Sequence, residues 1–212
     1  MTYDFTKRTI DILCASFLLV IFSPVMLITA VLIKLTSPGP IFADTPKRVG
    51  KDGKQFYAYK FRSMIVNAHG LLRTDPKFKK LYKKYRKSSY KLWDDPRITK
   101  VGKVIRKYSI DETPQFFNIL KGEMSIVGPR PYYVDELKEQ QKKYSDTKRL
   151  VNEMLKVRPG VTGYWQVTGR SEVNFDKRIE MDAYYARKKS IMLDILILLK
   201  TPWAMLTGKG AV

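Results

Sequence analysis

The sequence is poor in the residues that build disulfides and zinc sites. It has one cysteine, Cys14, and one histidine, His69, among 212 residues. A lone cysteine excludes a disulfide within the chain, which fits a reducing compartment. Cys14 lies in an apolar stretch, where a small packing residue is expected, and no Cys/His spacing of the zinc-binding kind is present. We therefore do not expect a disulfide-stabilised or zinc-stabilised domain.

Acidic residues are also scarce relative to basic ones. Lysine and arginine total 40 against 20 aspartates and glutamates, a formal net charge of +20. Such a surplus predicts an anionic partner, which could be nucleic acid, phospholipid headgroups or a phosphorylated substrate. The sequence has no internal repeats or low-complexity tracts. Its length allows one ordinary domain with a buried core and some extra helices.

One stretch lacks charge altogether. Residues 12–33 read "ILCASFLLVIFSPVMLITAVLI", and as a helix they would be about 33 Å long, the thickness of a hydrocarbon core. Ser23-Pro24 lies at the centre of this stretch. Proline removes one helical hydrogen bond and crowds the preceding turn, so we expect the helix to kink or break there. The Ser23 hydroxyl could supply a replacement donor for the freed carbonyl.

Two membrane topologies fit this stretch. Basic residues flank both ends, with Lys7 and Arg8 before it and Lys34 and Lys47 after it. The positive-inside rule therefore has no asymmetry on which to act. A hairpin that enters and leaves the same leaflet satisfies both flanks, and a plain spanning helix is the alternative. A cleaved signal peptide fits less well, because the apolar run is too long.

Signals for turns and helix ends divide the rest of the chain into short elements. "SPGP" at 37–40 predicts the end of the first helix, and "KDGK" at 51–54 predicts a hairpin turn. The aromatic-rich "QFYAYKF" at 55–61 is typical of a strand. Asp95-Pro96 predicts a turn. Helices are expected over 101–108, 133–157 and 176–206, with an irregular glycine-rich segment over 158–170.

Residues 77–91, "KFKKLYKKYRKSSYK", carry eight basic residues and no acid. Phe78, Leu81, Tyr82 and Tyr85 recur at helical spacing. This pattern predicts a basic amphipathic helix lying on an anionic membrane surface. A solvated basic face over a small apolar stripe is the alternative interpretation. RNA binding is disfavoured, because no RNP-like or helix-turn-helix pattern accompanies the aromatic residues.

The segment "RKYSIDETPQFFNILKGEMSIVGPRP" (106–131) holds two adjacent carboxylates, Asp111 and Glu112. Pro114 follows them and is suited to a first helical turn, while Gly122 is suited to end that helix. Ser109 and Glu112 also have the spacing of a capping box, in which acids at a helix start complement its dipole. For the isolated motif, this structural interpretation is stronger than catalysis.

The surroundings of the two carboxylates favour chemistry. Arg130 lies between Pro129 and Pro131, which would hold it rigidly for a bidentate phosphate contact. Asp111 and Glu112 could also hold Mg²⁺, with the remaining ligands from substrate phosphates and water. These are the parts of a phosphoryl-transfer site, and on a membrane-associated chain the acceptor could be a lipid phosphate. The candidate phosphate ligands are Lys60, Arg62, Arg106 and Arg130.

At these residues the sequence closely resembles the bacterial sugar transferase family, the monotopic polyprenyl-phosphate phosphoglycosyl transferases. "KFRSM", "DPRITKVGKVIRKYSIDETPQFFNILKGEMSIVGPRP" and "RPGVTGYWQVTGR" carry the resemblance, which runs from "KRTIDI" near the start to "LDILILLKT" near the end. The chain resembles the compact form, without the extra membrane helices that precede this domain in larger relatives. One departure is Thr113, because a leucine often precedes the proline at that position in the family.

The resemblance implies a mechanism. Asp111 would attack the sugar-bearing phosphate of a UDP-sugar, release UMP and retain the phosphosugar covalently. A polyprenyl phosphate, typically undecaprenyl phosphate, would then take the phosphosugar and form polyprenyl-diphospho-sugar, the first membrane step of bacterial surface glycan synthesis. Glu112 would accept the acceptor's proton or help to hold Mg²⁺. The residues that would hold phosphates are Lys60, Arg62, Arg106 and Arg130.

The resemblance also implies a fold and a location. The family carries the break that maps to Ser23 and Pro24, which favours the re-entrant topology. We expect a mostly helical α/β enzyme at the cytoplasmic face of the bacterial inner membrane. Residues 1–36 would form a re-entrant membrane helix hairpin. Residues 37–212 would form the catalytic domain, with a small β-hairpin and interfacial amphipathic helices.

The partners that follow are a UDP-sugar, a polyprenyl phosphate, inner-membrane lipids and a second copy of the chain in a homodimer, and no nucleic acid. Two other functions remain as alternatives. One is a basic membrane-tethered adaptor without catalysis, which would bind anionic lipid or nucleic acid. The other is a metal-dependent phosphatase that acts on lipid diphosphates and would release inorganic phosphate.

Overall fold

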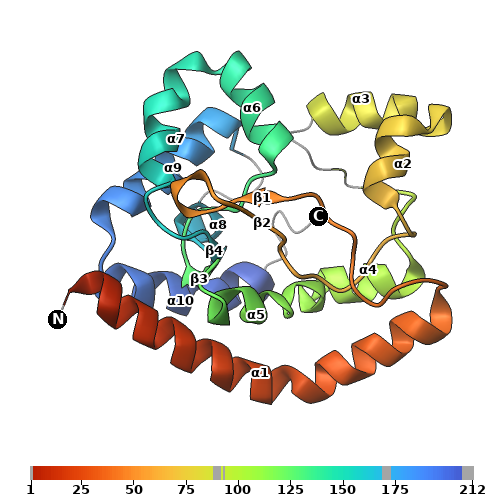
Figure 1. Ribbon diagram of the computed structural model, residues 1–212, viewed down its shortest axis with the longest axis horizontal. Helices are drawn as coiled ribbons and strands as arrows, with labels where there is room; N and C mark the ends of the chain where they lie inside the picture. Colours follow the sequence, from red (N-terminus) through yellow and green to blue (C-terminus); the bar gives the residue numbers. More distant parts are fainter. Residues whose placement is uncertain (1, 88–91, 93, 169–172, 207–212) are drawn as a thin grey trace. The chain divides into compact units, whose positions relative to one another are not determined.

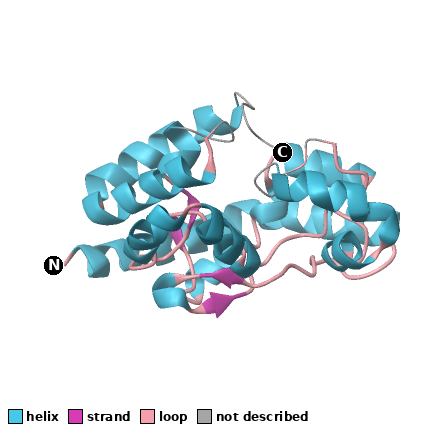
Figure 2. Ribbon diagram, turned by 90° about the horizontal axis from the view of Figure 1, so that it is seen from above, coloured by secondary structure: helices cyan, strands magenta, loops and turns pink. Residues whose placement is uncertain are grey.

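The computed structural model of the chain describes residues 2–87, 92, 94–168 and 173–206. Helices predominate in it, and the strands are short (Figure 2). The chain folds into two compact units that alternate along the sequence. The first unit contains the described residues up to Val20, then Lys47–Ala58 and the described residues from Gln115 to Leu206. The second contains Ile21–Pro46 and Tyr59–Pro114.

The first helix, α1, runs without interruption from Tyr3 to Thr36 (Figure 1). It continues through Pro24, so the chain does not leave the helical conformation there. Of the kink or break expected at this position, the break is not found, and the kink stays a prediction. Proline removes only one hydrogen bond, and its fixed φ is itself close to the helical value. The helix ends directly before the "SPGP" segment, as expected. The re-entrant hairpin stays a prediction.

By length and composition α1 could cross a membrane. Its mean hydropathy over the most apolar 18-residue window is 2.6, and only 11% of that window is buried in the protein. Exposed apolar side chains along it include Phe17 and Val20 in the first unit and Leu27 and Ile28 in the second. A helix with so little of its apolar surface covered by protein is suited to an apolar environment.

The first unit contains the expected hairpin. Strand β1 (Arg48–Val49) pairs antiparallel with β2 (Gln55–Phe56), and the short 3₁₀ helix η1 (Lys51–Gly53) joins them. Asp52 and Gly53 have positive φ values of 55° and 76°, which turn the chain sharply. Only Gln55–Phe56 of the strand expected over 55–61 belongs to this hairpin.

A second pair of strands in this unit is not predicted by the sequence pattern. Strand β3 (Ser125–Val127) pairs in parallel with β4 (Gly160–Thr162), inside the segment expected to be irregular. The backbones approach closely here. A Cβ atom on Gly128 would lie 2.3 Å from the Arg158 carbonyl oxygen, and one on Gly160 would lie 2.1 Å from the Gly128 nitrogen. Gly128 and Gly160 therefore permit the pairing of β3 with β4, because neither residue has a Cβ atom.

The helix expected over 133–157 is wrong as a single element. It is divided into α6 (Val134–Lys143), η4 (Ser145–Thr147) and α7 (Lys148–Met154). The division occurs at Tyr144, whose φ and ψ of −121° and 68° are not helical. The Tyr144 ring packs 5.8 Å from that of Phe175, measured between centroids. Packing of this partly buried ring accompanies the interruption of the helical pattern.

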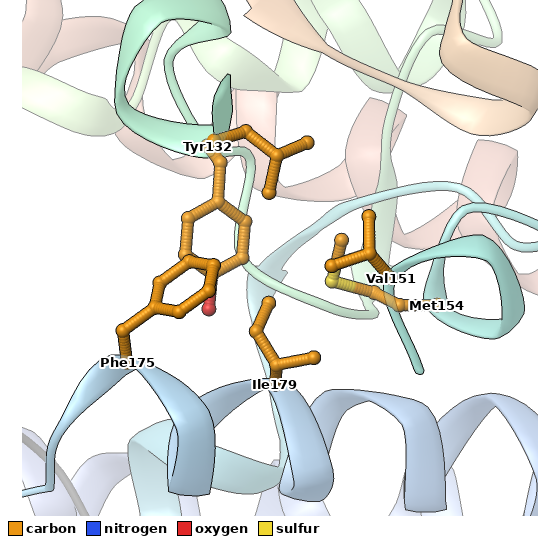
Figure 3. Close-up of a cluster of buried hydrophobic side chains, with 6 residues drawn as sticks. Tyr132, Val151, Met154, Phe175 and Ile179 are labelled. Atoms are coloured by element: carbon orange, nitrogen blue, oxygen red, sulfur yellow. The ribbon is translucent and has the colours of Figure 1, made fainter. Parts of the chain in front are cut away.

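The C-terminal helical region consists of two helices, α9 (Phe175–Lys188) and α10 (Ile191–Leu206), preceded by the short α8 (Tyr164–Thr168). Residues 169 and 170 of the glycine-rich segment lie outside the described residues. Helices α7 and α9 pack together over the main apolar core of this unit, and Phe175 and Ile179 point from α9 toward Tyr132 (Figure 3). The buried members of this core are Tyr132, Leu137, Val151, Met154, Phe175 and Ile179.

The second unit contains α2 (Ala68–Thr74), η2 (Pro76–Phe78), α3 (Lys79–Lys87), α4 (Lys100–Lys107) and η3 (Ile110–Glu112). Helix α4 confirms the helix expected over 101–108. The basic helix expected over 77–91 is present as η2 and α3, and residues 88–91 lie outside the described residues. The core of this unit includes Ile33 of α1, Phe61 and Ile105 of α4.

Candidate active site

The two adjacent carboxylates lie in η3, directly after α4. Ser109 separates the two helices with a left-handed conformation, at φ 55° and ψ 22°, which reverses the chain and directs Asp111 inward. The Asp111 side chain is buried, since the residue is only 7% exposed. Its backbone oxygen accepts a hydrogen bond of 2.9 Å from the Phe61 N–H, which ties η3 to the chain that carries Lys60.

The surroundings of Asp111 raise the pKa of its carboxyl group. Burial, together with the negative charge of Glu112, raises the pKa of Asp111 to about 6, while the charges of Lys60 and Arg106 act in the opposite direction. The carboxyl group is therefore ionised at neutral pH but is less well solvated than an exposed aspartate. A desolvated carboxylate with a pKa near the working pH is typical of catalytic groups.

Glu112 is held by Lys60. The Lys60 ammonium donates to Glu112 Oε1, and the two side chains are 21% and 37% exposed. The capping box expected between Ser109 and Glu112 is wrong, because the Ser109 side chain caps nothing in η3. A backbone hydrogen bond of 3.2 Å runs from the Glu112 N–H to the Ser109 carbonyl. The structural interpretation of the motif therefore loses its main support.

Arg106 and Arg62 differ in their surroundings. Arg106 lies in the last turn of α4, and its positive charge lowers the pKa of both Asp111 and Asp95. Arg62 is 4% exposed, and its guanidinium donates to the Pro40 carbonyl, the Ser37 hydroxyl and the Ser37 carbonyl. These contacts assign Arg62 to the loop that follows α1. Its expected role as a phosphate ligand stays a prediction that they do not support.

The "DPR" segment near this site has a structural role that the sequence did not reveal. Arg97 is 2% exposed and forms a buried ion pair with Asp95. Its guanidinium also donates to the Ala68 carbonyl at 2.7 Å. A paired and hydrogen-bonded buried charge of this kind fixes the turn that leads into α4. The contact with Ala68 joins this turn to α2, and sequence spacing does not report that contact.

The helix that follows the carboxylates has the expected signals. Pro114 directly precedes α5 (Gln115–Leu120) in the chain. Gly122, at φ 81°, donates from its N–H to the Ile119 carbonyl at 2.9 Å and ends the helix. A left-handed residue at this position favours glycine. The start and the end of α5 confirm the sequence prediction.

Arg130 lies in the first unit on the segment Pro129–Tyr133, which is fixed by hydrogen bonds along its length. The Pro129 carbonyl accepts from the Gly160 N–H at 2.8 Å. The Pro131 carbonyl accepts from the Arg48 guanidinium at 3.0 Å, and that guanidinium lies 3.3 Å from the Tyr133 ring centroid. The two prolines and these contacts leave the backbone around Arg130 few alternative conformations.

The Arg130 guanidinium lies beside aromatic rings. Its carbon is 5.7 Å from the Trp165 ring centroid and 5.8 Å from that of Tyr132. The residue is half-buried, and Trp165 is 4% exposed. A guanidinium interacts favourably with the faces of aromatic rings, which helps to fix its position. Sequence reasoning identified Arg130 but not Trp165, although the "GYWQ" segment offered an aromatic signal.

The structure thus brings Asp111, Glu112, Lys60 and Arg106 together within the second unit and places Arg130 with Pro129 and Pro131 in the first. Within the described residues no three histidine, cysteine or acidic side chains are grouped for a metal ion. The two adjacent carboxylates still fit Mg²⁺, which is commonly held by one or two carboxylates together with substrate phosphates and water. Glu112 would have to share or exchange its contact with Lys60.

Comparison with known proteins identifies a family. The profile of the bacterial sugar transferase family matches residues 2–208. The undecaprenyl-phosphate galactose phosphotransferase of Salmonella typhimurium is 43% identical over 98% of this chain. The UDP-glucose:undecaprenyl-phosphate glucose-1-phosphate transferase of Escherichia coli is 39% identical over 97% of this chain. The exopolysaccharide production protein ExoY of Sinorhizobium fredii is 38% identical over 97% of it.

These relatives differ in length. The chain spans 42% of the Salmonella protein and 41% of the Escherichia protein, but 88% of the Sinorhizobium protein. The matched region includes all the candidate residues described above. Since the family profile covers nearly the whole chain, and a relative of similar length is 38% identical, the chain belongs to the bacterial sugar transferase family.

Proposed function

We propose that the chain transfers a sugar-1-phosphate from a UDP-sugar to a polyprenyl phosphate, typically undecaprenyl phosphate. The names of the Salmonella and Escherichia relatives both include undecaprenyl phosphate, with different sugars. The observation that carries the proposal is the buried Asp111, with its pKa raised to about 6, beside the Lys60–Glu112 ion pair. This combination suits a nucleophile for phosphoryl transfer.

In the first half-reaction, an Asp111 carboxylate oxygen attacks the phosphorus that bears the sugar. A bond forms between that oxygen and the phosphorus, and the bond from the phosphorus to the bridging oxygen breaks, so that UMP leaves with the bridging oxygen. The product is an acyl phosphate on Asp111 that carries the sugar. Because Asp111 is ionised above pH 6 and partly desolvated, it is competent to attack without a separate base.

In the second half-reaction, a phosphate oxygen of the polyprenyl phosphate attacks the same phosphorus. The bond to Asp111 breaks, the carboxylate is regenerated, and polyprenyl-diphospho-sugar is released. Glu112 is the nearest second carboxylate in sequence and is 37% exposed as a side chain, so it can accept a proton from an incoming acceptor phosphate. Lys60 is a candidate ligand for the donor phosphates, and in the structure it pairs with Glu112. We propose that it balances the negative charge of the two acids.

Mg²⁺ is part of the proposal. Glu112 and Asp111 would contact it, and when bound it would neutralise charge on the donor's phosphates. Arg106 supplies further positive charge in the second unit, and Arg130 does so in the first. Both are suited to hold phosphate oxygens, since guanidinium groups bind them bidentately.

The acceptor implies a membrane location, and two helices support it. Helix α1 is apolar and mostly uncovered by protein. Helix α10 exposes one apolar face at helical spacing, and its buried face carries Asp194 and Ile197. A helix with one uncovered apolar face and a terminal tryptophan suits the membrane interface. The uncovered side chains of α10 are Met192, Ile195, Leu196, Leu199 and Trp203.

The test is a panel of UDP-sugars with purified protein, Mg²⁺ and undecaprenyl phosphate. Release of UMP, dependent on the acceptor for sustained turnover, supports the transferase and identifies the sugar. A basic adaptor without catalysis would release nothing from any donor. A lipid diphosphate phosphatase would instead release inorganic phosphate from undecaprenyl diphosphate. The catalytic domain is expected on the cytoplasmic side of the bacterial inner membrane, where UDP-sugars are available.

A further inference from the structure

A buried carboxylate without a role in the proposed reaction lies against the Arg130 segment. Asp182 on α9 is 0% exposed. Its Oδ2 accepts a hydrogen bond from the Tyr132 hydroxyl at 3.1 Å and one from the Arg130 backbone N–H at 3.4 Å. These two donors flank Pro131 in the chain. A single carboxylate oxygen therefore joins two points of the segment that carries Arg130.

The other carboxylate oxygen of Asp182, Oδ1, is also buried. Among the described residues, none forms a hydrogen bond with Oδ1. Burial raises the pKa of Asp182 to about 7, while its hydrogen bonds to Tyr132 and the Arg130 N–H and the charge of Arg178 act in the opposite direction. A buried acid with a half-satisfied carboxylate costs stability rather than providing it. The geometry that Asp182 imposes on its neighbours is a better reason for its presence.

Arg178 supplies a compensating charge. It lies one helical turn before Asp182 on α9 and is 1% exposed. Its guanidinium donates to the Val173 carbonyl at 3.3 Å and lies 5.1 Å from the Trp165 ring centroid. The Arg130 guanidinium lies 5.7 Å from the same ring. Two positive groups therefore share one indole, and such a pair needs a nearby negative charge.

We propose that Asp182 is a positioning residue for Arg130. By holding the Arg130 backbone and the Tyr132 hydroxyl on one oxygen, it fixes the segment Pro129–Tyr133 so that the Arg130 guanidinium stays beside Trp165 and faces an anionic group of the nucleotide donor. Because Asp182 is fully buried, we expect it to act on the donor only through Arg130. The inference rests on the proposed function, in which Arg130 binds a donor phosphate, and it adds the residue that places Arg130.

The physical basis is preorganisation. Pro129 and Pro131 restrict the backbone on either side of Arg130 but do not by themselves select one arrangement. The contacts from Arg48 and Gly160 hold the carbonyls of the two prolines. The Arg130 N–H is instead held by Asp182. Loss of that contact would free the backbone at Arg130, and the position of the Arg130 side chain determines whether it can bind phosphate bidentately.

A double-mutant cycle on UDP binding tests the proposal. The full-length protein in lipid nanodiscs is titrated with UDP in the presence of Mg²⁺, and Kd is measured for wild type, Arg130→Ala, Asp182→Ala and the double variant. We expect Arg130→Ala to raise Kd about ten-fold or more, and Asp182→Ala to raise it by somewhat less. Because Asp182 acts only through Arg130, the double variant should bind UDP no more weakly than Arg130→Ala alone.

Three results would overturn it, and they separate the two levels of inference. If the increases in Kd caused by Asp182→Ala and Arg130→Ala multiply in the double variant, Asp182 acts independently of Arg130. If Arg130→Ala weakens UDP binding and Asp182→Ala does not, the positioning role fails while the proposed function stands. If Arg130→Ala itself leaves Kd unchanged, the donor-phosphate role of Arg130 fails and takes the positioning role with it.

Conservative variants keep the test valid if Asp182→Ala does not fold. Asp182→Asn retains the size of the side chain and an oxygen acceptor, so it should bind UDP within about three-fold of wild type. Tyr132→Phe removes one of the two hydrogen bonds and should raise Kd in the wild-type background but not in Arg130→Ala. Equal effects of Tyr132→Phe in both backgrounds would contradict the proposal. Asp146→Asn, at an exposed acid of η4, is the control and should leave Kd unchanged.

Discussion

The Lys60 ammonium donates to the carboxylate of Glu112, the residue that directly follows the buried Asp111. One lysine therefore neutralises the acid next to the proposed nucleophile, and its charge also lowers the pKa of Asp111 against the effect of burial. The sequence analysis assigned Lys60 to phosphate binding. The structure adds a second role, in which Lys60 balances the charge of the two adjacent acids.

Asp111→Asn should abolish turnover while the protein still folds, because a carboxamide cannot form the acyl phosphate. Mass spectrometry of wild type with the donor alone should show a phosphosugar adduct that is missing from the variant. Asp94→Asn, at an exposed acid of the same unit, is the matched control and should retain the adduct. Near-normal UMP release by Asp111→Asn would remove Asp111 from the mechanism.

Lys60→Ala should shift the pH dependence of adduct formation toward higher pH. In wild type the rate should rise as Asp111 ionises, around its pKa of about 6. Removal of the Lys60 charge takes away an effect that lowers this pKa, so a higher pH is needed for the same ionised fraction. The measurement is the single-turnover rate of UMP release without acceptor, from pH 5 to pH 9. An unshifted profile would show that Lys60 does not set the acidity of Asp111.

Arg130→Ala should lower kcat/KM for the UDP-sugar by roughly ten-fold to one hundred-fold. A charge-assisted hydrogen bond to phosphate contributes about 1.5–3 kcal/mol, and 1.4 kcal/mol corresponds to a factor of ten. Arg149→Ala removes a guanidinium whose side chain is 89% exposed and serves as the control for net charge. If both variants keep wild-type kcat/KM, Arg130 has a structural role only.

Replacing both Ser23 and Pro24 with leucine tests the topology of α1. The change restores the backbone donor that proline lacks, and thereby favours a straight helix of spanning length. If wild-type α1 is re-entrant, a probe ahead of Met1 should be protected from impermeant reagents outside the cell. The double variant should expose a fraction of the N-termini and lose activity. Labelling of the wild-type N-terminus from outside would instead indicate a spanning helix.

Local signals in the sequence predicted several elements correctly, because they act over a few residues. "KDGK" predicted the turn of the β1–β2 hairpin, since Asp52 and Gly53 adopt the positive φ that such a turn needs. Pro114 and Gly122 bounded α5, and the amphipathic period located α4. The family motifs identified Asp111 and Glu112. The burial of Asp111 and the pairing of Glu112 with Lys60 were not predicted.

Contacts between distant segments decided the rest. The pairing of β3 with β4 requires Gly128 and Gly160 to meet, and no local pattern records which glycines approach each other. The partly buried Tyr144 ring packs against Phe175 where the chain divides a segment whose polar pattern favoured one helix. The sequence by itself determined the chemistry-bearing residue types and their order. Tertiary structure determined which of them are buried, since desolvation and charge pairing depend on neighbours far along the chain.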